Sequence, residues 1–244
     1  MMAGCIRAEL RKLRGAWIFA ALALLPVISA AYGTFNFLRN REILTQGWRS
    51  LFTQHTLFYA LFFFSPLVGV FAAYQWRLEH VGRNFYTLMS APVPPFACFA
   101  AKGIVALALA LLMQGWTFVL YVFCGRVFCG LPGFPPAQIV LYMLRGLLGA
   151  VPVAALQTLL SMAIAGFALP VLTALAGGVA GLAFAAKGAG LCWPYALMIL
   201  GMNSNRSEDM LAGGLGGYVL ACAGHTLAIC LLAQLLMTRR DVQA

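Results

Sequence analysis

Few side chains in this sequence could carry acid–base chemistry, and they lie far apart. The 244 residues include only 3 His and 6 Asp+Glu. His225 lies in the middle of a long apolar run, whereas the acidic residues all lie outside such runs. A buried histidine with no carboxylate beside it usually packs or forms a hydrogen bond between helices. Ser65 precedes Pro66 and lacks the glycine-flanked turn of a hydrolase nucleophile. We therefore predict no catalytic residue and expect that the chain is not an enzyme.

The 7 cysteines do not suggest a metal site. They show neither a C-x-x-C pair nor the Cys/His spacing of a zinc site. Most of them lie inside apolar runs, where a free cysteine packs as a small apolar side chain. Cys124 and Cys129 differ, because they could meet at a helix end, either as a disulfide or as two free thiols. We expect no metal and no cofactor in this chain.

Polar side chains inside the apolar runs are the remaining candidates for a transport path. Carriers driven by protons or sodium ions usually rely on acidic residues within the membrane. All acidic residues of this chain lie outside the apolar runs, which argues against a carrier of that kind. Arg145 is the one charge well inside a run; it is either a functional residue or a side chain that reaches back to the outer surface. Gln114 and Gln157 either line a path or bridge helices.

The elements that must position these residues are predicted to be membrane-spanning helices. Hydrophobic residues make up 63% of the chain and charged residues 9%, and the mean hydropathy is +0.90. A spanning helix needs about 20 mostly apolar residues, and continuous apolar runs favour helices over the alternating strands of a barrel. We predict an all-α membrane protein with a single domain, 1–244. Its six spans are expected at residues 16–35, 51–74, 96–123, 137–167, 168–186 and 211–237.

Two shorter segments are predicted to lie at the membrane surface. Residues 1–15 have one apolar and one basic face at helical spacing, as in an interfacial amphipathic helix; the alternative is a plain charged flank of the first span. The apolar face contains Ile6, Leu10, Leu13 and Trp17, and the basic face contains Arg7, Arg11 and Arg14. The apolar segment within 187–210 is too short to cross the membrane. We favour an extracellular re-entrant or interfacial segment there over an ordinary loop.

The distribution of basic residues predicts the orientation. The net charge is +10, but the Lys and Arg residues are scattered at helix ends, so we expect contact with lipid headgroups and no nucleic acid. Six crossings place both termini on one side, and that side carries more basic residues than the other. The positive-inside rule then places both termini in the cytoplasm of a multi-pass protein of the cell membrane.

A polar segment between the second and third predicted spans, residues 75–95, has an amphipathic pattern. Leu78, Val81, Phe85 and Leu88 share one helical stripe, and prolines end the helix before the third span. Such a helix either gives a soluble partner a rigid handle or floats among the headgroups.

The order of landmarks in the chain resembles permease subunits of type-two ABC exporters. These landmarks are the basic N-terminal helix with Glu9 and Lys12, the Glu79-to-Asn84 helix, Pro92, and Lys102 at the start of the third span. The chain looks most similar to the branch that includes lantibiotic-immunity and bacitracin-resistance permeases. The resemblance covers most of the chain in layout and is sharpest over residues 77–102.

The resemblance implies a mechanism and a set of partners. Residues 76–90 would form a cytoplasmic coupling helix that contacts an ATP-binding cassette subunit. The contact residues would be Trp76, Glu79, His80, Arg83, Asn84 and Tyr86. The chain has no phosphate-binding G-x-x-x-x-G-K-[ST] loop, so ATP and Mg²⁺ would be bound by that separate subunit. A second permease subunit, identical or related, would complete a dimer, and the substrate would be an amphipathic peptide antibiotic expelled for self-immunity. The alternative is a stand-alone polytopic membrane enzyme or assembly factor without an ATPase partner.

Overall fold

The protein is a bundle of long helices. The computed structural model describes residues 1–81 and 92–240, and within these ranges every regular element is a helix. Six helices are long and apolar enough to cross a membrane, which confirms the predicted all-α membrane fold. In the part of the chain that the structure describes, three shorter helices accompany them: α1 (Met2–Lys12), the 3-10 helix η3 (Gly190–Cys192) and α9 (Pro194–Gly201).

The observed spans agree with the six apolar runs but differ at several ends. They are α2 (Ile18–Arg39), the continuous rod of α3 (Trp48–Phe58), the π-helix η1 (Tyr59–Phe64) and α4 (Ser65–His80), then α6 (Pro95–Val127), α7 (Ala137–Ala163), α8 (Ala168–Ala186) and α10 (Leu215–Arg240). The second span continues past the predicted end at residue 74, because the polar side chains of Gln75 and Glu79 are buried against neighbouring helices. The sixth span begins later than predicted, after Gly213 with a φ of +79° that glycine readily adopts.

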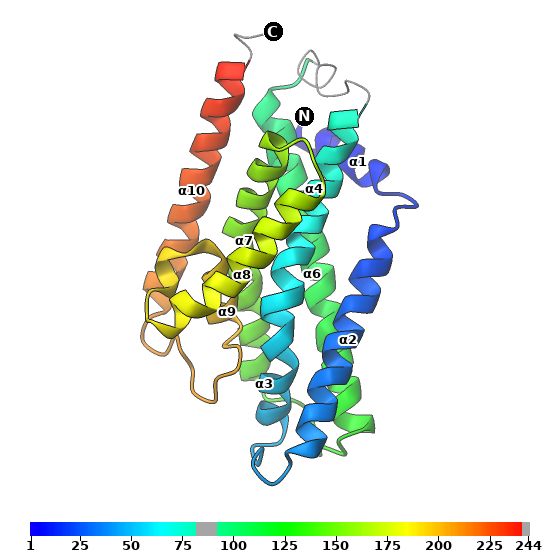
Figure 1. Cartoon of the computed structure of the whole chain (residues 1–244), viewed down its shortest axis with the longest axis vertical. Coiled ribbons are helices and arrows are strands. Elements are labelled where there is room, and N and C mark those ends of the chain that lie inside the picture. Colours follow the sequence, from blue (N-terminus) through cyan, green and yellow to red (C-terminus); the bar gives the residue numbers. More distant parts are fainter. Residues whose placement is uncertain (82–91, 241–244) are drawn as a thin grey trace.

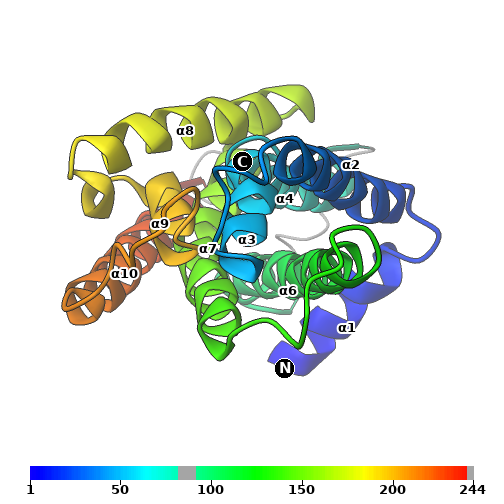
Figure 2. The same ribbon diagram turned by 90° about the horizontal axis from the view of Figure 1, so that it is seen from below.

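The helices are arranged around the rod of α3 and α4 together with α7. Both views show α10 on one side of this centre and α1 and α2 on the other (Figures 1 and 2). The N-terminal helix α1, the last turn of α4 and the last turn of α10 lie at the same end of the bundle (Figure 1). The α2–α3 and α6–α7 connections lie at the opposite end.

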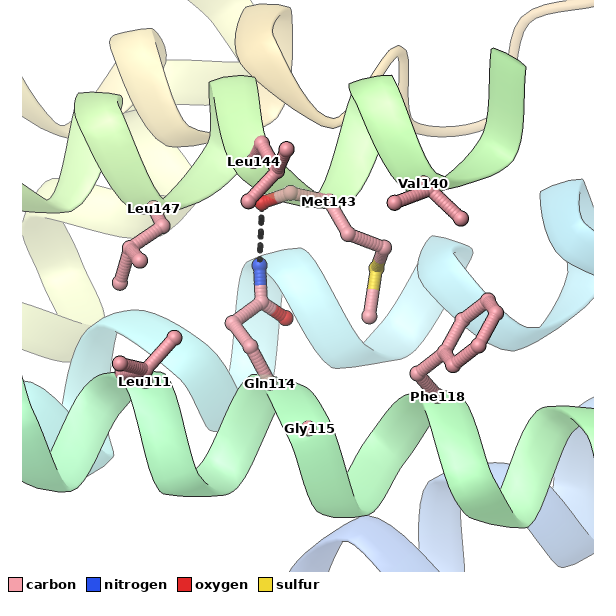
Figure 3. Close-up of a pocket in the computed structure, with 8 residues that line it drawn as sticks. All are labelled: Leu111, Gln114, Gly115, Phe118, Val140, Met143, Leu144 and Leu147. Carbon is pink, nitrogen blue, oxygen red and sulfur yellow. Dashed lines mark hydrogen bonds between the residues drawn. The ribbon is translucent and has the colours of Figure 1, made fainter. Parts of the chain in front are cut away.

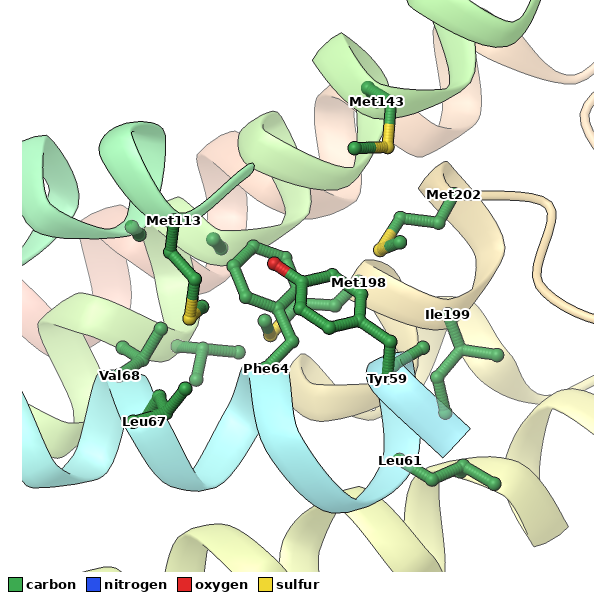
Figure 4. Packing of buried hydrophobic residues seen from close by; sticks show 14 of the residues in the cluster. Tyr59, Leu61, Phe64, Leu67, Val68, Met113, Met143, Met198, Ile199 and Met202 are labelled. Carbon is green, nitrogen blue, oxygen red and sulfur yellow. The ribbon is translucent and has the colours of Figure 1, made fainter. Parts of the chain in front are cut away.

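The core is centred on the π-helix. The rings of Tyr59 and Phe64 stack with their centroids 5.3 Å apart, and methionines from α6, α7 and α9 surround them (Figure 4). Pro66 follows directly in α4; it has no N–H, and its ring would collide with a carbonyl four residues back in a regular helix. The wider π-turn just before it accommodates this proline.

The connection between α8 and α10 contains a short buried helix. Tyr195 to Gly201 of α9 are all buried, and α9 packs against α7 and α8. Close approach to α8 depends on Gly177, where a Cβ atom would lie 2.5 Å from the Tyr195 ring. The segment is thus a packed helix and not a loop that only rests its aromatic side chains on the rim. Its extracellular position stays a prediction.

All 7 cysteines are free thiols in the structure. Cys124 and Cys129, the pair at the end of α6, are both buried and form no disulfide.

Candidate functional site

Four charged side chains from three separate elements meet at the end of the bundle where α1 and the last turn of α10 lie (Figure 1). Glu9 and Lys12 come from α1, Glu79 from the last turn of α4 and Lys102 from the second turn of α6. We call these four residues the charge cluster. Lys102 Nζ lies 2.7 Å from Glu9 Oε2 and 2.8 Å from Glu79 Oε1. Lys12 Nζ lies 2.8 Å from Glu9 Oε1 and also pairs with Glu79.

The charge cluster is electrically balanced and largely removed from solvent. Lys102 is 0% exposed, Glu79 4% and Glu9 5%. Lys102 also donates a hydrogen bond to the Gln75 carbonyl oxygen at 3.3 Å, and its Nζ lies 5.2 Å from the centroid of the Trp76 ring. Each buried charge costs free energy unless it is paired, so the two lysines and the two glutamates depend on one another. Removing one partner of such a buried pair costs about 3–5 kcal/mol.

The sequence of α1 explains how it delivers two of the four charges. Glu9 and Lys12 are three residues apart and so lie on one helical face, which the structure turns toward α6. Arg7, Arg11 and Arg14 are exposed. The predicted apolar face is divided: Leu13 is buried, whereas Leu10 is 48% exposed. The helix was correctly predicted, but it docks on the bundle through charges as well as apolar side chains.

Lys12 is held in its charged form by this arrangement. Partial burial lowers the pKa of Lys12, but the hydrogen bonds to Glu79 and Glu9 outweigh burial and raise the pKa above its ordinary value. Lys12 is also the most exposed member of the charge cluster, with 34% of its side chain accessible. It therefore closes the solvent side of the charge cluster.

The thiols of Cys5 and Cys98 lie at the same contact between α1 and α6. They come from α1 and from the first turn of α6, and they lie close enough to interact electrostatically. This contact gives a second, independent pair of residues that join α1 to α6.

The predicted contact residues of the coupling helix that the structure describes, Trp76, Glu79 and His80, face neighbouring helices, whereas Arg77 and Val81 are exposed. Trp76 is fully buried, Glu79 belongs to the charge cluster, and His80 Nε2 lies 3.0 Å from the Ser161 carbonyl oxygen of α7. For Glu79, the physical reason for expecting a partner contact, an accessible side chain, does not hold. Arg83, Asn84 and Tyr86 lie outside the described residues. Contact between this segment and an ATP-binding subunit stays a prediction.

The other polar candidates bridge helices at separate places. Arg145 Nη1 lies 3.0 and 2.8 Å from the two carboxylate oxygens of Asp209, so the charge is paired and not merely directed to the surface. Gln157 donates to the Tyr195 hydroxyl at 2.5 Å, and Gln114 to the Met143 carbonyl oxygen at 3.2 Å. Arg145 and Gln157 are twelve residues apart along α7, roughly 18 Å, so they do not form one site.

One further sequence candidate, His225, has a structural role. His225 Nε2 lies 3.0 Å from the Leu191 carbonyl oxygen, the contact between helices that its position predicted. Within residues 1–81 and 92–240, no three His, Cys, Asp or Glu side chains are close enough to share a metal ion.

Comparison with known proteins identifies the family. The model of a family described as ABC-2 family transporter protein matches residues 5–181, which extend from α1 into α8 and include all four residues of the charge cluster. No curated protein and no solved structure matches the chain. Members of this family are membrane permeases of ABC transporters, and the family implies an ATP-binding cassette partner. Because the match covers well over half of the chain, this multi-pass membrane protein belongs to the ABC-2 transporter family.

Proposed function

We propose that the chain is the permease subunit of an ATP-driven exporter and that the charge cluster transmits force from an ATP-binding subunit. The observation that carries the proposal is the position of Glu79 and Lys102. They lie on either side of the segment between α4 and α6, and they form an ion pair with each other. The same pair binds α1 through Glu9 and Lys12. A displacement applied to that segment would therefore move α1, α4 and α6 together.

The proposed orientation places this end of the bundle in the cytoplasm. Its support is the excess of basic residues at this end, including the exposed Arg7, Arg11 and Arg14 of α1. Residues 76–90, which we call the lever, would then lie where a soluble ATP-binding subunit can reach them. Trp76, Glu79 and His80 would hold the base of this lever, and Arg83, Asn84 and Tyr86 would make the contacts with the partner.

The proposed substrate is an amphipathic peptide taken from the membrane. The spans contain few charges, and Arg145 is already neutralised by Asp209, so a highly polar substrate would find few partners. Self-immunity to a lantibiotic rests on the sequence resemblance alone. A second permease subunit would face this one across the substrate path.

Co-purification tests the proposal against the stand-alone alternative. The tagged chain, extracted from its own membranes in a mild detergent, should bring an ATP-binding cassette protein with it in a constant ratio. A chain that carries no such protein, under conditions in which it stays folded, would contradict the exporter assignment.

Substitution tests the lever within that complex. Arg83→Ala with Asn84→Ala should lower the amount of substrate moved per ATP hydrolysed while expression is unchanged. Glu42→Ala, an exposed acidic position in the α2–α3 connection at the opposite end, is the matched control and should leave the ratio unaltered. An unchanged ratio in the double variant would remove the coupling role from residues 76–90.

A further inference from the structure

A small groove between α6 and α7 is lined by apolar residues and by one polar side chain, that of Gln114. The groove has a volume of about 150 Å³, and seven of its eight lining residues have no polar side-chain group able to form a strong hydrogen bond. The lining residues are Leu111, Gln114, Gly115, Phe118, Val140, Met143, Leu144 and Leu147 (Figure 3). The leucines at positions 111 and 144 are exposed on the outer surface of the bundle, where the bilayer would lie, whereas Gln114 is 4% exposed and Met143 is buried.

The carboxamide of Gln114 is only half satisfied. Its amino group donates to the Met143 carbonyl oxygen at 3.2 Å, and a carbonyl can only accept, so this contact fixes which end of the carboxamide is which. Gln114 Oε1 then points into the space between Met143 and Phe118 (Figure 3). Among the described residues it has no hydrogen-bond partner. A buried amide oxygen without a donor is unfavourable. Gln114 Oε1 is itself buried, so a ligand in the groove reaches it when the side chain of Met143 or Phe118 moves aside, and a ligand that supplies a donor then satisfies it.

The size of the groove defines the rest of the ligand. An enclosed apolar cavity of about 150 Å³ holds a benzene ring, so this groove, which is open on one side, has room for one aromatic ring. Phe118 and the thioether of Met143 offer favourable contacts to an aromatic ring. We propose that this groove binds a single aromatic ring that carries one hydrogen-bond donor, a phenol or indole group on an amphiphile dissolved in the bilayer, with the donor directed at Gln114 Oε1.

This inference goes beyond the proposed transport function, because binding is a property of the permease chain alone. The test therefore uses the purified full-length chain in lipid nanodiscs, without ATP or a partner subunit. The probes are p-cresol and p-xylene, which have nearly the same shape; p-cresol has a hydroxyl group where p-xylene has a second methyl group. Binding is followed by the NMR signal of the Met143 methyl group, identified with a Met143→Leu sample, and affinities are expressed per concentration in the bilayer.

In the unmodified chain, p-cresol should bind roughly fivefold to tenfold more tightly than p-xylene, because only the phenol satisfies the amide oxygen. Gln114→Leu should reduce this ratio to about one. Gln157→Leu, which removes a second buried carboxamide outside the groove, should leave the ratio unchanged. A Cβ atom at Gly115 would meet nothing within 4 Å, so Gly115→Leu should fill the groove and abolish binding of both probes.

Several outcomes would overturn the inference. Equal affinity of the two probes in the unmodified chain does so whether or not any variant folds. The inference is also overturned if neither probe shifts the Met143 methyl signal. It is overturned as well if the preference for p-cresol over p-xylene persists in Gln114→Leu or in Gly115→Leu.

Discussion

Glu79 and Lys102 lie on different helices, on either side of the segment that joins α4 to α6, and their charged groups are 2.8 Å apart. The pair is buried and shares both of its members with α1. In the proposed exporter this ion pair joins the two helices that flank the lever, so that a force on the lever would move α1, α4 and α6 together. The first prediction concerns this pair.

Glu79→Gln should strongly destabilise the bundle. The substitution keeps the shape of the side chain but leaves Lys102 with Glu9 as its one remaining anionic partner among the described residues. Loss of one partner from a buried ion pair costs about 3–5 kcal/mol, so the thermal unfolding midpoint in detergent should fall by many degrees. Glu208→Gln, at an exposed site, should change stability by no more than about 0.5 kcal/mol.

An exchange of charges separates this electrostatic effect from altered shape. Glu79→Lys combined with Lys102→Glu restores the attraction between positions 79 and 102 but opposes Lys12 and Glu9 with like charges. The double variant should therefore be about as stable as either single variant, and much more stable than the sum of the two single losses predicts. If the double variant is as unstable as the sum of the single variants, the residues are not coupled as the structure indicates.

The contribution of Lys12 should depend on pH at the alkaline end. Because the folded protein raises the pKa of Lys12 above its ordinary value of 10.5, the stability it provides is fully present below pH 10.5 and is lost as pH rises through the folded-state pKa. The difference in unfolding midpoint between the unmodified chain and Lys12→Met should be constant from pH 7 to about pH 10 and shrink above it. Arg11→Met, the exposed neighbour on α1, should show no such pH dependence. A difference that grows with pH would contradict the assignment.

Cys5 and Cys98 provide a native reporter of α1 docking. Their thiols lie close enough to interact electrostatically, so mild oxidation of the chain in membranes should link peptides that contain these two residues. Glu9→Gln removes the ion pair that holds α1 to Lys102 and should lower the yield of this link severalfold. Mass spectrometry of the digested protein measures the yield. Arg7→Gln, which alters an exposed charge of the same helix, should not change it.

Asp209→Asn should loosen the connection between α9 and α10. Asp209 accepts both hydrogen bonds from Arg145 and also one from the Leu211 backbone N–H at 3.0 Å. Arg145 would keep its charge in a mostly buried place without a carboxylate, at a cost of roughly 1–3 kcal/mol. Hydrogen exchange of residues 202–214 should therefore become faster. Equal exchange in Asp209→Asn and Glu208→Gln would show that the ion pair does not hold the segment.

The six spans could be predicted from the sequence because lipid leaves few alternatives for a long apolar run. Errors occur where polar residues are neutralised by contacts distant in sequence. The sequence pattern places the end of the second span at Tyr74 because Gln75, Arg77 and Glu79 follow, yet Gln75 and Glu79 are buried. The later start of α10 depends on Gly213, whose turn conformation is one of several that a Gly-rich stretch allows.

The charge cluster could be predicted only in part. The spacing of Glu9 and Lys12 indicates a pair on one helical face, and a single lysine in the apolar third span is itself a signal. That Lys102 meets Glu9 and Glu79, 93 and 23 residues away in sequence, follows from helix packing that no local pattern encodes. The same holds for Arg145, whose partner Asp209 lies 64 residues away.

The orientation of the lever tests the central claim most directly. In a chain whose native cysteines are replaced, Asn84→Cys and Glu42→Cys place single thiols between α4 and α6 and in the α2–α3 connection at the opposite end of the bundle. With a membrane-impermeant maleimide on intact cells, we predict labelling at position 42 and none at position 84, and the reverse in inverted membrane vesicles. Labelling at position 84 from outside intact cells would contradict a lever driven by a cytoplasmic ATP-binding subunit.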